Sequence, residues 1–312
     1  MAEFSDEELH TKPVTFMGAP YTHDLAGAKA AVLGVPFDCG IHPFRIGSRQ
    51  GPTAIREQSI QMRPYNSELA DFSPIERLGL VDRGNVRLTP GRIVDAFERI
   101  EAAARLIHDA GVIPVTMGGD GSVSLPLMRA AARRYPGMVA VHLDSHTDSY
   151  GYEAHDKYNA ATQFTHAAEE QCIIPSLTYH IGIRGTTYTP GVFERTRALG
   201  YNIITLRELL KRGFDDVLAE LHERLKGRPV YLCFDMDVMD PSCAPGVCSP
   251  SWGGLLAREG IEILRGLAGL DIVAVDFNTV SPPHDVNNMT AFLCAHLMYE
   301  ALVLLCRKPD AR

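Results

Sequence analysis

Short apolar runs rich in β-branched residues alternate with amphipathic segments along most of the chain. In the amphipathic segments, apolar residues recur every three or four positions, which is the spacing of one face of an α-helix. The apolar runs are bounded by turn-forming residues and predict strands that are covered on both faces. The predicted strands are 30–37, 112–119, 138–145, 178–183, 202–206, 229–238 and 271–280, and the amphipathic segments include 91–111, 206–227 and 258–269.

The repeated order of strand, helix and strand predicts an α/β fold in which helices cover both faces of a mostly parallel sheet. The sequence contains no internal repeat and no low-complexity linker, so we expect a single domain over residues 26–312. Residues 1–25 are predicted to form a peripheral N-terminal arm. The stretch from Tyr150 to Pro175 is long and irregular, which is typical of a functional loop.

Composition and charge narrow the classes of protein that the chain can belong to. With 46% hydrophobic and 22% charged residues among 312, the composition is that of an ordinary folded protein. The net charge of −8 argues against nucleic-acid and anionic-membrane partners. Seven cysteines without framework spacing indicate reduced thiols. The first residues, MAEFSDEELHTKP, lack the features of a signal peptide, so we expect a cytoplasmic protein.

Acidic and imidazole side chains follow two of the apolar strands. Asp144, His146 and Asp148 occupy alternate positions after one strand, and Asp235 and Asp237 do so at the end of another. Alternate side chains of an extended backbone point to one side, and ligands of parallel sheets bind beyond the carboxyl ends of the strands. Four carboxylates in such a place would repel one another without a cation. Oxygen and nitrogen donors of this kind predict a divalent metal site.

Turn chemistry is the competing interpretation of these residues. A single Asp after a strand is more often a helix cap or a turn former than a metal ligand. Two such motifs after two buried strands favour the metal site. His142 shares the parity of Asp144 but lies deeper in its strand, so we expect it to pack rather than to bind metal. His155 and His166 fall in the predicted loop, where histidines are usually solvated.

Seven stretches resemble motifs of the ureohydrolases, the family that includes arginase, agmatinase and guanidinobutyrase. The matches occur in the family's order and span nearly the whole chain. The resemblance implies a three-layer α/β/α sandwich on a mostly parallel sheet, usually assembled into trimers or hexamers. The stretches are FRIGSRQGPTAIRE (44–57, similar to GxRxGPxxIR), VTMGGDGS (GGDHS), HLDSHTD (DAHxD), IGIRG (181–185), CFDMDVMDP (SFDxDxxDP), SWGGLLARE (251–259, GGLxxRE) and DFNTVSPPHD (276–285, VEVSPPYD).

The resemblance also implies a chemistry and a set of ligands. In ureohydrolases, two Mn²⁺ or Ni²⁺ ions share a hydroxide that attacks the guanidinium carbon and releases urea, or a substituted urea, and an amine. Carried over to this sequence, Asp144, His146, Asp235 and Asp237 would surround one ion. Asp144, Asp148 and Asp235 would face the other ion, whose remaining ligand is the histidine of the family's GGDHS motif.

The sequence departs from the family at three functional positions. Gly121 stands where GGDHS has its histidine. In KYNAATQF (157–164), which resembles the family's KYxHGTPF, Ala160 replaces a histidine that shuttles protons or holds the substrate. Thr279 replaces the glutamate that pairs with the guanidinium. A hydrogen bond to a charged group is worth about 1.5–3 kcal/mol and a general acid or base about 10²–10⁴ in rate, so these losses should remove most activity.

Two hypotheses follow. The favoured one is a catalytically degenerate subunit that binds zero or one ion and works with an active ureohydrolase paralogue in a heteromer. This pattern resembles the non-catalytic β subunit of nickel-dependent hydrolases acting on metformin or dimethylguanidine. The alternative is an active enzyme that binds one Ni²⁺ or Mn²⁺ through Asp144, His146, Asp235 and Asp237. A small or N-alkylated guanidino substrate would then suit the neutral hydroxyl of Thr279.

Overall fold

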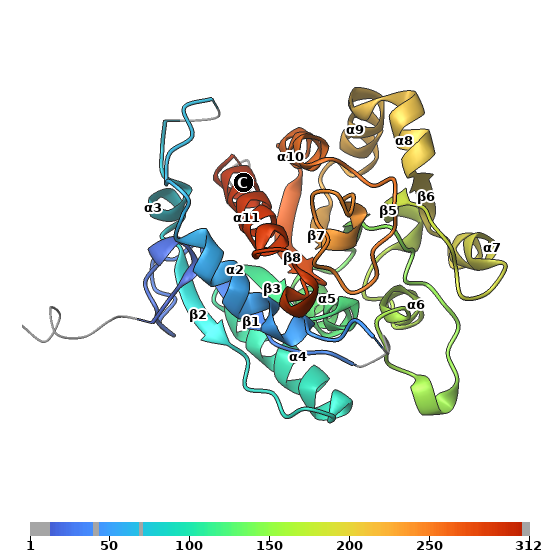
Figure 1. Ribbon diagram of the computed structural model, residues 1–312, viewed down its shortest axis with the longest axis horizontal. Coiled ribbons are helices and arrows are strands. Elements are labelled where there is room, and N and C mark those ends of the chain that lie inside the picture. Colours follow the sequence, from blue (N-terminus) through green and yellow to red (C-terminus); the bar gives the residue numbers. More distant parts are fainter. Residues whose placement is uncertain (1–12, 40–43, 69–70, 308–312) are drawn as a thin grey trace, which may run out of the picture.

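Eight parallel strands form one sheet at the centre of the molecule, and the computed structural model describes residues 13–39, 44–68 and 71–307 (Figure 1). The order of strands across the sheet is β2-β1-β3-β8-β7-β4-β5-β6. All seven predicted strands are present. The strands are β1 (Ala30–Val35), β2 (Val81–Asn85), β3 (Ile113–Gly118), β4 (Val139–Leu143), β5 (Tyr179–Ile183), β6 (Asn202–Thr205), β7 (Pro229–Asp235) and β8 (Asp271–Asn278).

Helices pack on both faces of the sheet, so the three-layer prediction is confirmed (Figure 1). One face carries α2 (Gly51–Ser59), α3 (Pro74–Leu78), α8 (Leu206–Arg212), α9 (Phe214–Arg224), α10 (Ala257–Gly266) and α11 (Met289–Cys306). The other face carries α4 (Ile93–Asp109), α5 (Ser124–Arg134) and α6 (Gln163–Glu169), while α7 (Val192–Ala198) contacts β6. Short 3₁₀ helices are η1 (Phe16–Gly18), η2 (Ser48–Gln50), η3 (Gly121–Val123), η4 (Ala154–Asp156), η5 (Pro175–Leu177), η6 (Met236–Val238) and η7 (Pro282–His284).

The central strands are apolar on both sides because each side meets a different core. In β7, Leu232 and Phe234 face the core beneath α11, whereas Tyr231 and Cys233 face the core beneath α4 and α5. This alternation explains the uninterrupted apolar runs, since no side of these strands meets water. The helix α11 is apolar for the same reason: its 18 residues have a mean hydropathy of 1.8, and 72% of them are buried inside the molecule.

Three local features differ from the expectations. The edge strand β2 was not predicted, because its sequence VDRGN carries mostly polar residues and glycine. The amphipathic stretch 206–227 forms two helices instead of one, because Gly213 adopts a φ of 86° and interrupts the helical hydrogen bonds. The predicted loop 150–175 contains η4 and α6, and α6 buries Phe164 in the core.

The N-terminal segment packs against the β2 edge over the part that the structure describes. Phe16 is fully buried, Ala19 is 2% exposed and Tyr21 forms a parallel bridge with Asp82. Residues 1–12 of the predicted arm and residues 308–312 lie outside the described residues. The boundary between arm and domain therefore stays a prediction.

A buried ion pair fastens this segment to the sheet. The guanidinium of Arg56 donates to both carboxylate oxygens of Asp82, at 2.8 and 2.9 Å, and Asp82 also accepts from the backbone N–H of Phe16 at 2.9 Å. The two charged side chains are 7% and 0% exposed. Removing one member of such a pair leaves the other charge buried without compensation.

We expect Asp82→Ala to lower the free energy of unfolding by about 3–5 kcal/mol, the usual cost of breaking a buried ion pair. Denaturant titration followed by circular dichroism measures this change. The matched control is Asp95→Ala, which removes the exposed Arg99–Asp95 pair on α4 and should leave stability nearly unchanged. Equal losses of stability in the two variants would contradict the assignment of Arg56 and Asp82 as a stabilising buried ion pair.

Candidate metal centre

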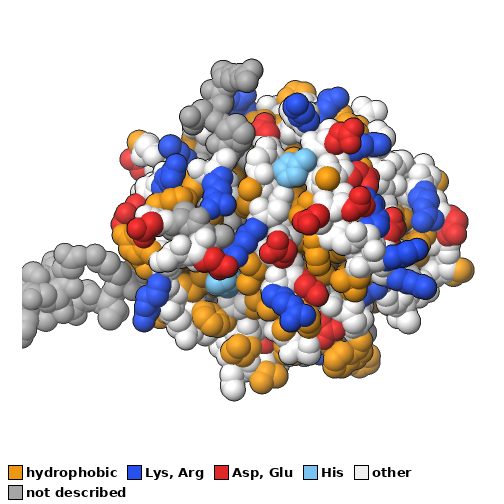
Figure 2. Space-filling view, turned by 90° about the horizontal axis from the view of Figure 1, so that it is seen from above, with side chains coloured by type: hydrophobic (Ala, Val, Ile, Leu, Met, Phe, Trp, Pro, Cys, Tyr) orange, Lys and Arg blue, Asp and Glu red, His pale blue; other side chains and the backbone are white. Residues whose placement is uncertain are grey.

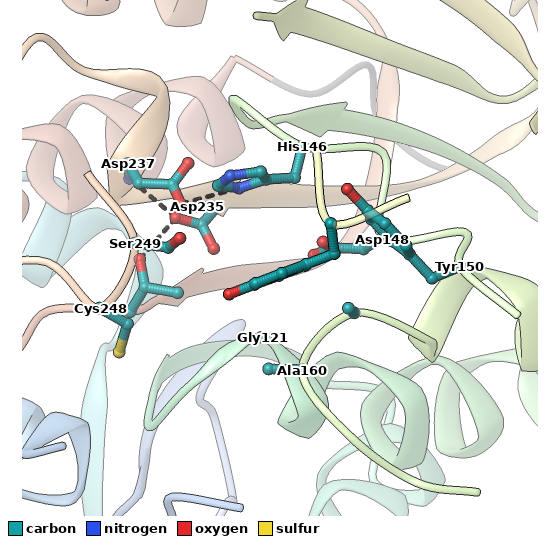
Figure 3. A pocket seen from close by; sticks show the side chains of 12 residues that line it. Gly121, His146, Asp148, Tyr150, Ala160, Asp235, Asp237, Cys248 and Ser249 are labelled. Atoms are coloured by element: carbon teal, nitrogen blue, oxygen red, sulfur yellow. Dashed lines mark hydrogen bonds and ion pairs between the residues drawn. The ribbon is translucent and has the colours of Figure 1, made fainter. Parts of the chain in front are cut away.

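The predicted metal ligands meet because β4 and β7 are neighbours in the sheet. His142 pairs with Cys233 and Leu143 with Phe234, so the same register brings Asp144 beside Asp235. Both aspartates continue the side of their strands that faces α5 and α6. Figure 3 shows Asp235, Asp237 and His146 together on one side of a pocket and Asp148 on another.

A first group of donors consists of Asp144, His146 and Asp237, whose ligand atoms all lie within 4.8 Å of one another. Nδ1 of His146 is 3.1 Å from Oδ2 of Asp237 and 3.3 Å from Oδ1 of Asp144. Both carboxylates are buried, whereas the imidazole is 18% exposed toward the pocket. The N–H and hydroxyl of Ser145 donate to Oδ1 of Asp237 at 3.1 and 2.8 Å, which fixes the orientation of that carboxylate.

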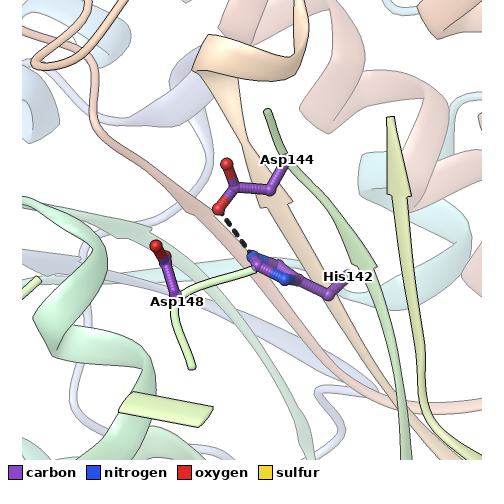
Figure 4. A group of neighbouring side chains, drawn as sticks. All are labelled: His142, Asp144 and Asp148. Carbon is purple, nitrogen blue, oxygen red and sulfur yellow. Dashed lines mark ion pairs between the residues drawn. The ribbon is translucent and has the colours of Figure 1, made fainter. Parts of the chain in front are cut away.

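A second group consists of His142, Asp144 and Asp148 (Figure 4). Nε2 of His142 lies 2.9 Å from Oδ2 of Asp144, and its Nδ1 lies 2.8 Å from Nδ1 of His180. The ring packs against Phe164 with centroids 4.3 Å apart. Both ring nitrogens thus have protein neighbours, and His142 is packed inside the molecule, as predicted.

Burial and mutual repulsion dominate the electrostatics of the cluster. Burial, with the nearby Asp237 charge, raises the pKa of Asp144 to about 7 and raises the pKa of Asp235 well above its usual value. The pKa of Asp148 is raised well above its usual value by burial and by Asp144. Without a cation, the cluster therefore retains protons that isolated carboxyl groups would lose at neutral pH.

One ion pair inside the cluster opposes this trend. Burial disfavours the charges of both His146 and Asp237, but their mutual attraction outweighs it. The pKa of His146 is consequently raised well above its usual value, and the pKa of Asp237 is lowered. This imidazolium–carboxylate pair occupies the place where a metal ion would have its imidazole and carboxylate ligands.

The three positions that depart from the ureohydrolase motifs line the same pocket. Gly121, Ala160 and Thr279 line it together with Asp148 and Asp235. In Figure 3, Gly121 and Ala160 leave their part of the wall without a functional side chain.

Thr279 keeps an unusual backbone conformation at this position. Its φ is 67°, a left-handed conformation that is strained for a β-branched residue. Its N–H donates to the carbonyl of Gly119 at 2.7 Å, and its Oγ1 lies 2.5 Å from Oδ1 of Asp235. Strain of this kind persists at sites where the surrounding structure imposes it.

Several pocket residues were not predicted. Tyr150, Tyr188, Cys248 and Ser249 complete the wall. Gln163 was also missed: it is 2% exposed, and its amide donates to Oδ2 of Asp148. The signal that could have identified it is the motif KYNAATQF, where glutamine stands in place of the proline of KYxHGTPF.

Other candidate residues lie outside the cluster. Asp240 accepts hydrogen bonds from the N–H groups of Ser242 and Gly254, both at 2.9 Å, so it forms a turn. His155 is exposed. His166 was expected to be solvated, but this was wrong: it is 1% exposed, and Nε2 lies 2.6 Å from the carbonyl oxygen of Lys157, because α6 turns it inward.

Comparison with known proteins places this site in a family. The model of the arginase family matches residues 28–304. The chain is 38% identical to guanidinopropionase and 35% identical to guanidinobutyrase of Pseudomonas aeruginosa, covering 93% of this chain in both cases and 91% and 92% of those proteins. The structure of proclavaminate amidino hydrolase from Streptomyces clavuligerus superposes with a TM-score of 0.91 at 31% identity, covering 95% of this chain and 98% of that chain.

The chain belongs to the arginase family. Arginase-family enzymes use a dinuclear manganese site, so the donors of this chain can be tested against two ions. Asp144, His146 and Asp237 converge so that they could hold one ion, with Asp235 beside them. Oδ2 of Asp144, which lies beside His142 in the second group, is buried without a well-oriented hydrogen bond.

The second position of the arginase-family site fits an ion poorly. Gly121 offers no donor, and the amide of Gln163 already donates to Asp148. The neutral ring of His142, whose pKa burial lowers to about 4, contacts Asp144 through one nitrogen and His180 through the other. The second group therefore offers a poorer set of donors than the first.

We expect the metal-free protein to lose stability as the pH rises from about 6 to about 8. Asp144, Asp148, Asp235 and His146 have raised pKa values, so in this window the folded state still holds protons that the unfolded carboxyl groups have already lost and that the unfolded imidazole is losing. The lowered pKa of Asp237 stabilises the folded state by an amount that does not change between about pH 6 and 8, because this carboxyl group is deprotonated there in both the folded and the unfolded state.

Differential scanning fluorimetry with a chelator, compared with added Mn²⁺ or Ni²⁺, measures this dependence. A bound cation favours the deprotonated ligands, so metal should flatten or reverse the decline in Tm. Asp144→Asn, which removes one titrating group, should weaken the pH dependence. A metal-free Tm that is higher at pH 8 than at pH 6 would contradict this account of the cluster.

Proposed function

We propose that this chain is a catalytically silent ureohydrolase subunit that works in a heteromer with an active relative acting on a small guanidino compound. The observation that carries the proposal is the selective loss at one pocket: Gly121, Ala160 and Thr279 all line it, while the surrounding fold is kept. A subunit retained for assembly must preserve its core and its contact surfaces but not its chemistry.

The missing groups matter because of what hydrolysis of a guanidinium requires. A divalent cation would lower the pKa of water and so supply hydroxide for attack on the guanidinium carbon. The leaving amine must also receive a proton, and the cationic substrate must be held. Ala160 cannot transfer a proton, and the hydroxyl of Thr279, directed at Asp235, carries no charge to pair with a guanidinium.

The donors that remain in the site have a structural role within this subunit. Asp144, His146, Asp235 and Asp237 can hold one cation, and Ser145 orients Asp237 through two hydrogen bonds. Such a cation would join the ends of β4 and β7 and relieve the repulsion between their carboxylates. In this proposal, the ion supports the structure of the subunit, and the partner performs the chemistry.

The surface is compatible with a protein partner and a small substrate. Large apolar side chains are exposed, among them Phe44 at 89%, Trp252 at 78% and Tyr188 at 71%, and Tyr188 also lines the pocket. Figure 2 shows acidic and basic side chains interspersed over the face that it displays, rather than a single basic stripe. Exposed aromatic residues are enriched where proteins contact one another.

A second candidate function is favoured by the pocket itself, which stays open beside intact ligands. His146, Asp235, Asp237 and Tyr150 all line it, so a small N-alkylated guanidino compound bound there would lie against the ligands of a single ion. A neutral threonine would suit a substrate with fewer N–H donors than an unsubstituted guanidinium.

The isolated chain should release no urea or substituted urea from guanidino compounds when loaded with Ni²⁺ or Mn²⁺. Turnover should appear when the chain is mixed with an active arginase-family paralogue of the same cell, and it should exceed that of the paralogue alone. Urea release and size-exclusion chromatography with light scattering measure activity and assembly. Turnover of about 1 s⁻¹ or more by the isolated chain would establish the second candidate function instead.

Matched substitutions locate the chemistry within the complex. Asp237→Asn in this chain should reduce turnover of the complex far less than replacement of the corresponding aspartate in the partner. Equal losses would mean that both subunits catalyse, and loss only from the change in this chain would reverse the proposed roles.

A further inference from the structure

The side chain of Gln163 fills the space that a side chain at position 121 would enter. A Cβ atom built on Gly121 would lie 2.7 Å from Nε2 of Gln163 and 3.3 Å from Oδ2 of Asp148. The backbone at Gly121 is not in a left-handed conformation, so it does not itself require glycine. A larger residue there would have to displace the amide group of Gln163, and the carbonyl oxygen of Ala160, 3.3 Å from the same Cβ, narrows the space further.

In this contact the Gln163 amide donates a hydrogen bond, whereas a metal ligand donates an electron pair. The Nε2 group of Gln163 donates to Oδ2 of Asp148, so the carboxylate receives a proton donor where the family's second ion would supply positive charge. The nitrogen of a side-chain amide carries two hydrogens and its lone pair is delocalised into the carbonyl group, so it does not bind a cation. The contact is buried, since Gln163 is 2% exposed and Asp148 is 5% exposed, and hydrogen bonds to a carboxylate are strong in such surroundings.

Asp148 needs a partner of this kind because of its own position. It is surrounded by Asp144, His142 and the pocket wall, and its backbone adopts a φ of 48°. A buried carboxylate that lacks both a cation and a donor would be strongly destabilising. The Gln163 amide, in the first turn of α6, supplies a neutral donor to Oδ2 of Asp148.

We propose that Gln163 replaces the second cation of the arginase-family pair: its amide fills the ion's place and binds Asp148, so the chain holds a single ion. The inference rests on the proposed function only in that both assign the chain at most one ion. It adds that the side chain of Gln163 occupies the position of the second ion and that Gly121 leaves the space for it.

The same hydrogen bond also links two segments of the pocket, as the replaced ion would. Gln163 begins α6 directly after Ala160, Ala161 and Thr162, and both alanines line the pocket. The amide therefore ties this wall to Asp148 at the end of β4, as an ion shared between the two segments would. Backbone hydrogen bonds from Phe164 to Asp148 and from Tyr150 to Ala161, both of 3.0 Å, join the same segments, and the amide adds a side-chain link to them.

The experiment counts Mn²⁺ ions bound to the full-length chain by native mass spectrometry and elemental analysis after removal of metal and reloading. Electron paramagnetic resonance adds a second readout, because an isolated Mn²⁺ ion and an exchange-coupled pair give different spectra. The variants are Gly121→His, Gln163→Ala, the double variant of both, and Gln163→Glu. Thr165→Ala is the matched control, since Thr165 is equally buried in α6 but bonds to the carbonyl of Tyr150 instead.

We expect one ion in the parent chain, in Gln163→Ala, in Thr165→Ala and in Gly121→His, where the amide obstructs the new imidazole. The double variant should bind a second ion and give the spectrum of a coupled pair. Gln163→Glu should also gain an ion, because it sets a second carboxylate beside Asp148, and its Tm should rise more with Mn²⁺ than that of the parent chain.

Three results would overturn the inference. The first is a parent chain with two ions that falls to one in Gln163→Ala, because Gln163 would then be a ligand through its Oε1, which is buried without a partner. The second is a pair of ions in Gly121→His with Gln163 in place. The third is a single ion in both the double variant and Gln163→Glu. None of these depends on turnover, so a chain that binds one ion and hydrolyses guanidino compounds would refute the proposed function alone.

Discussion

The site is governed by the burial of four carboxylates where two neighbouring parallel strands end. The register of β4 and β7 brings Asp144 beside Asp235, and Asp148 follows Asp144 by four positions while Asp237 follows Asp235 by two. So many negative charges cannot share a buried edge unless protons, donors or cations compensate them. The structure combines several solutions: raised pKa values, an imidazolium at His146 and the amide of Gln163.

These solutions are distributed unevenly across the site. Around Asp144 and Asp237, the compensating group is a histidine that a metal can convert into a ligand by displacing its proton. Around Asp148, the compensating group is an amide, whose donor remains a donor over the whole physiological pH range. The cluster thus has one half that can exchange protons for a cation and one half in which a neutral side chain holds Asp148 by a hydrogen bond.

The sequence was sufficient for the fold and for the convergence of the acids, but not for everything at the site. Uninterrupted apolar runs identify buried parallel strands, and alternate spacing identifies side chains that share a direction, so Asp144 and Asp235 could be placed together. The strand β2 escaped prediction because an edge strand need not be apolar. Gln163 escaped because its role arises from contact with Asp148 and Gly121 across the fold, and His166 was misjudged because helix α6 turns it inward.

The crowding between Gly121 and Gln163 also constrains how this lineage can change. A histidine arriving first at position 121 would collide with the amide, whereas a smaller residue arriving first at position 163 would leave Asp148 buried without its donor. The effect of a substitution at either position therefore depends on the residue at the other, which is epistasis through direct contact.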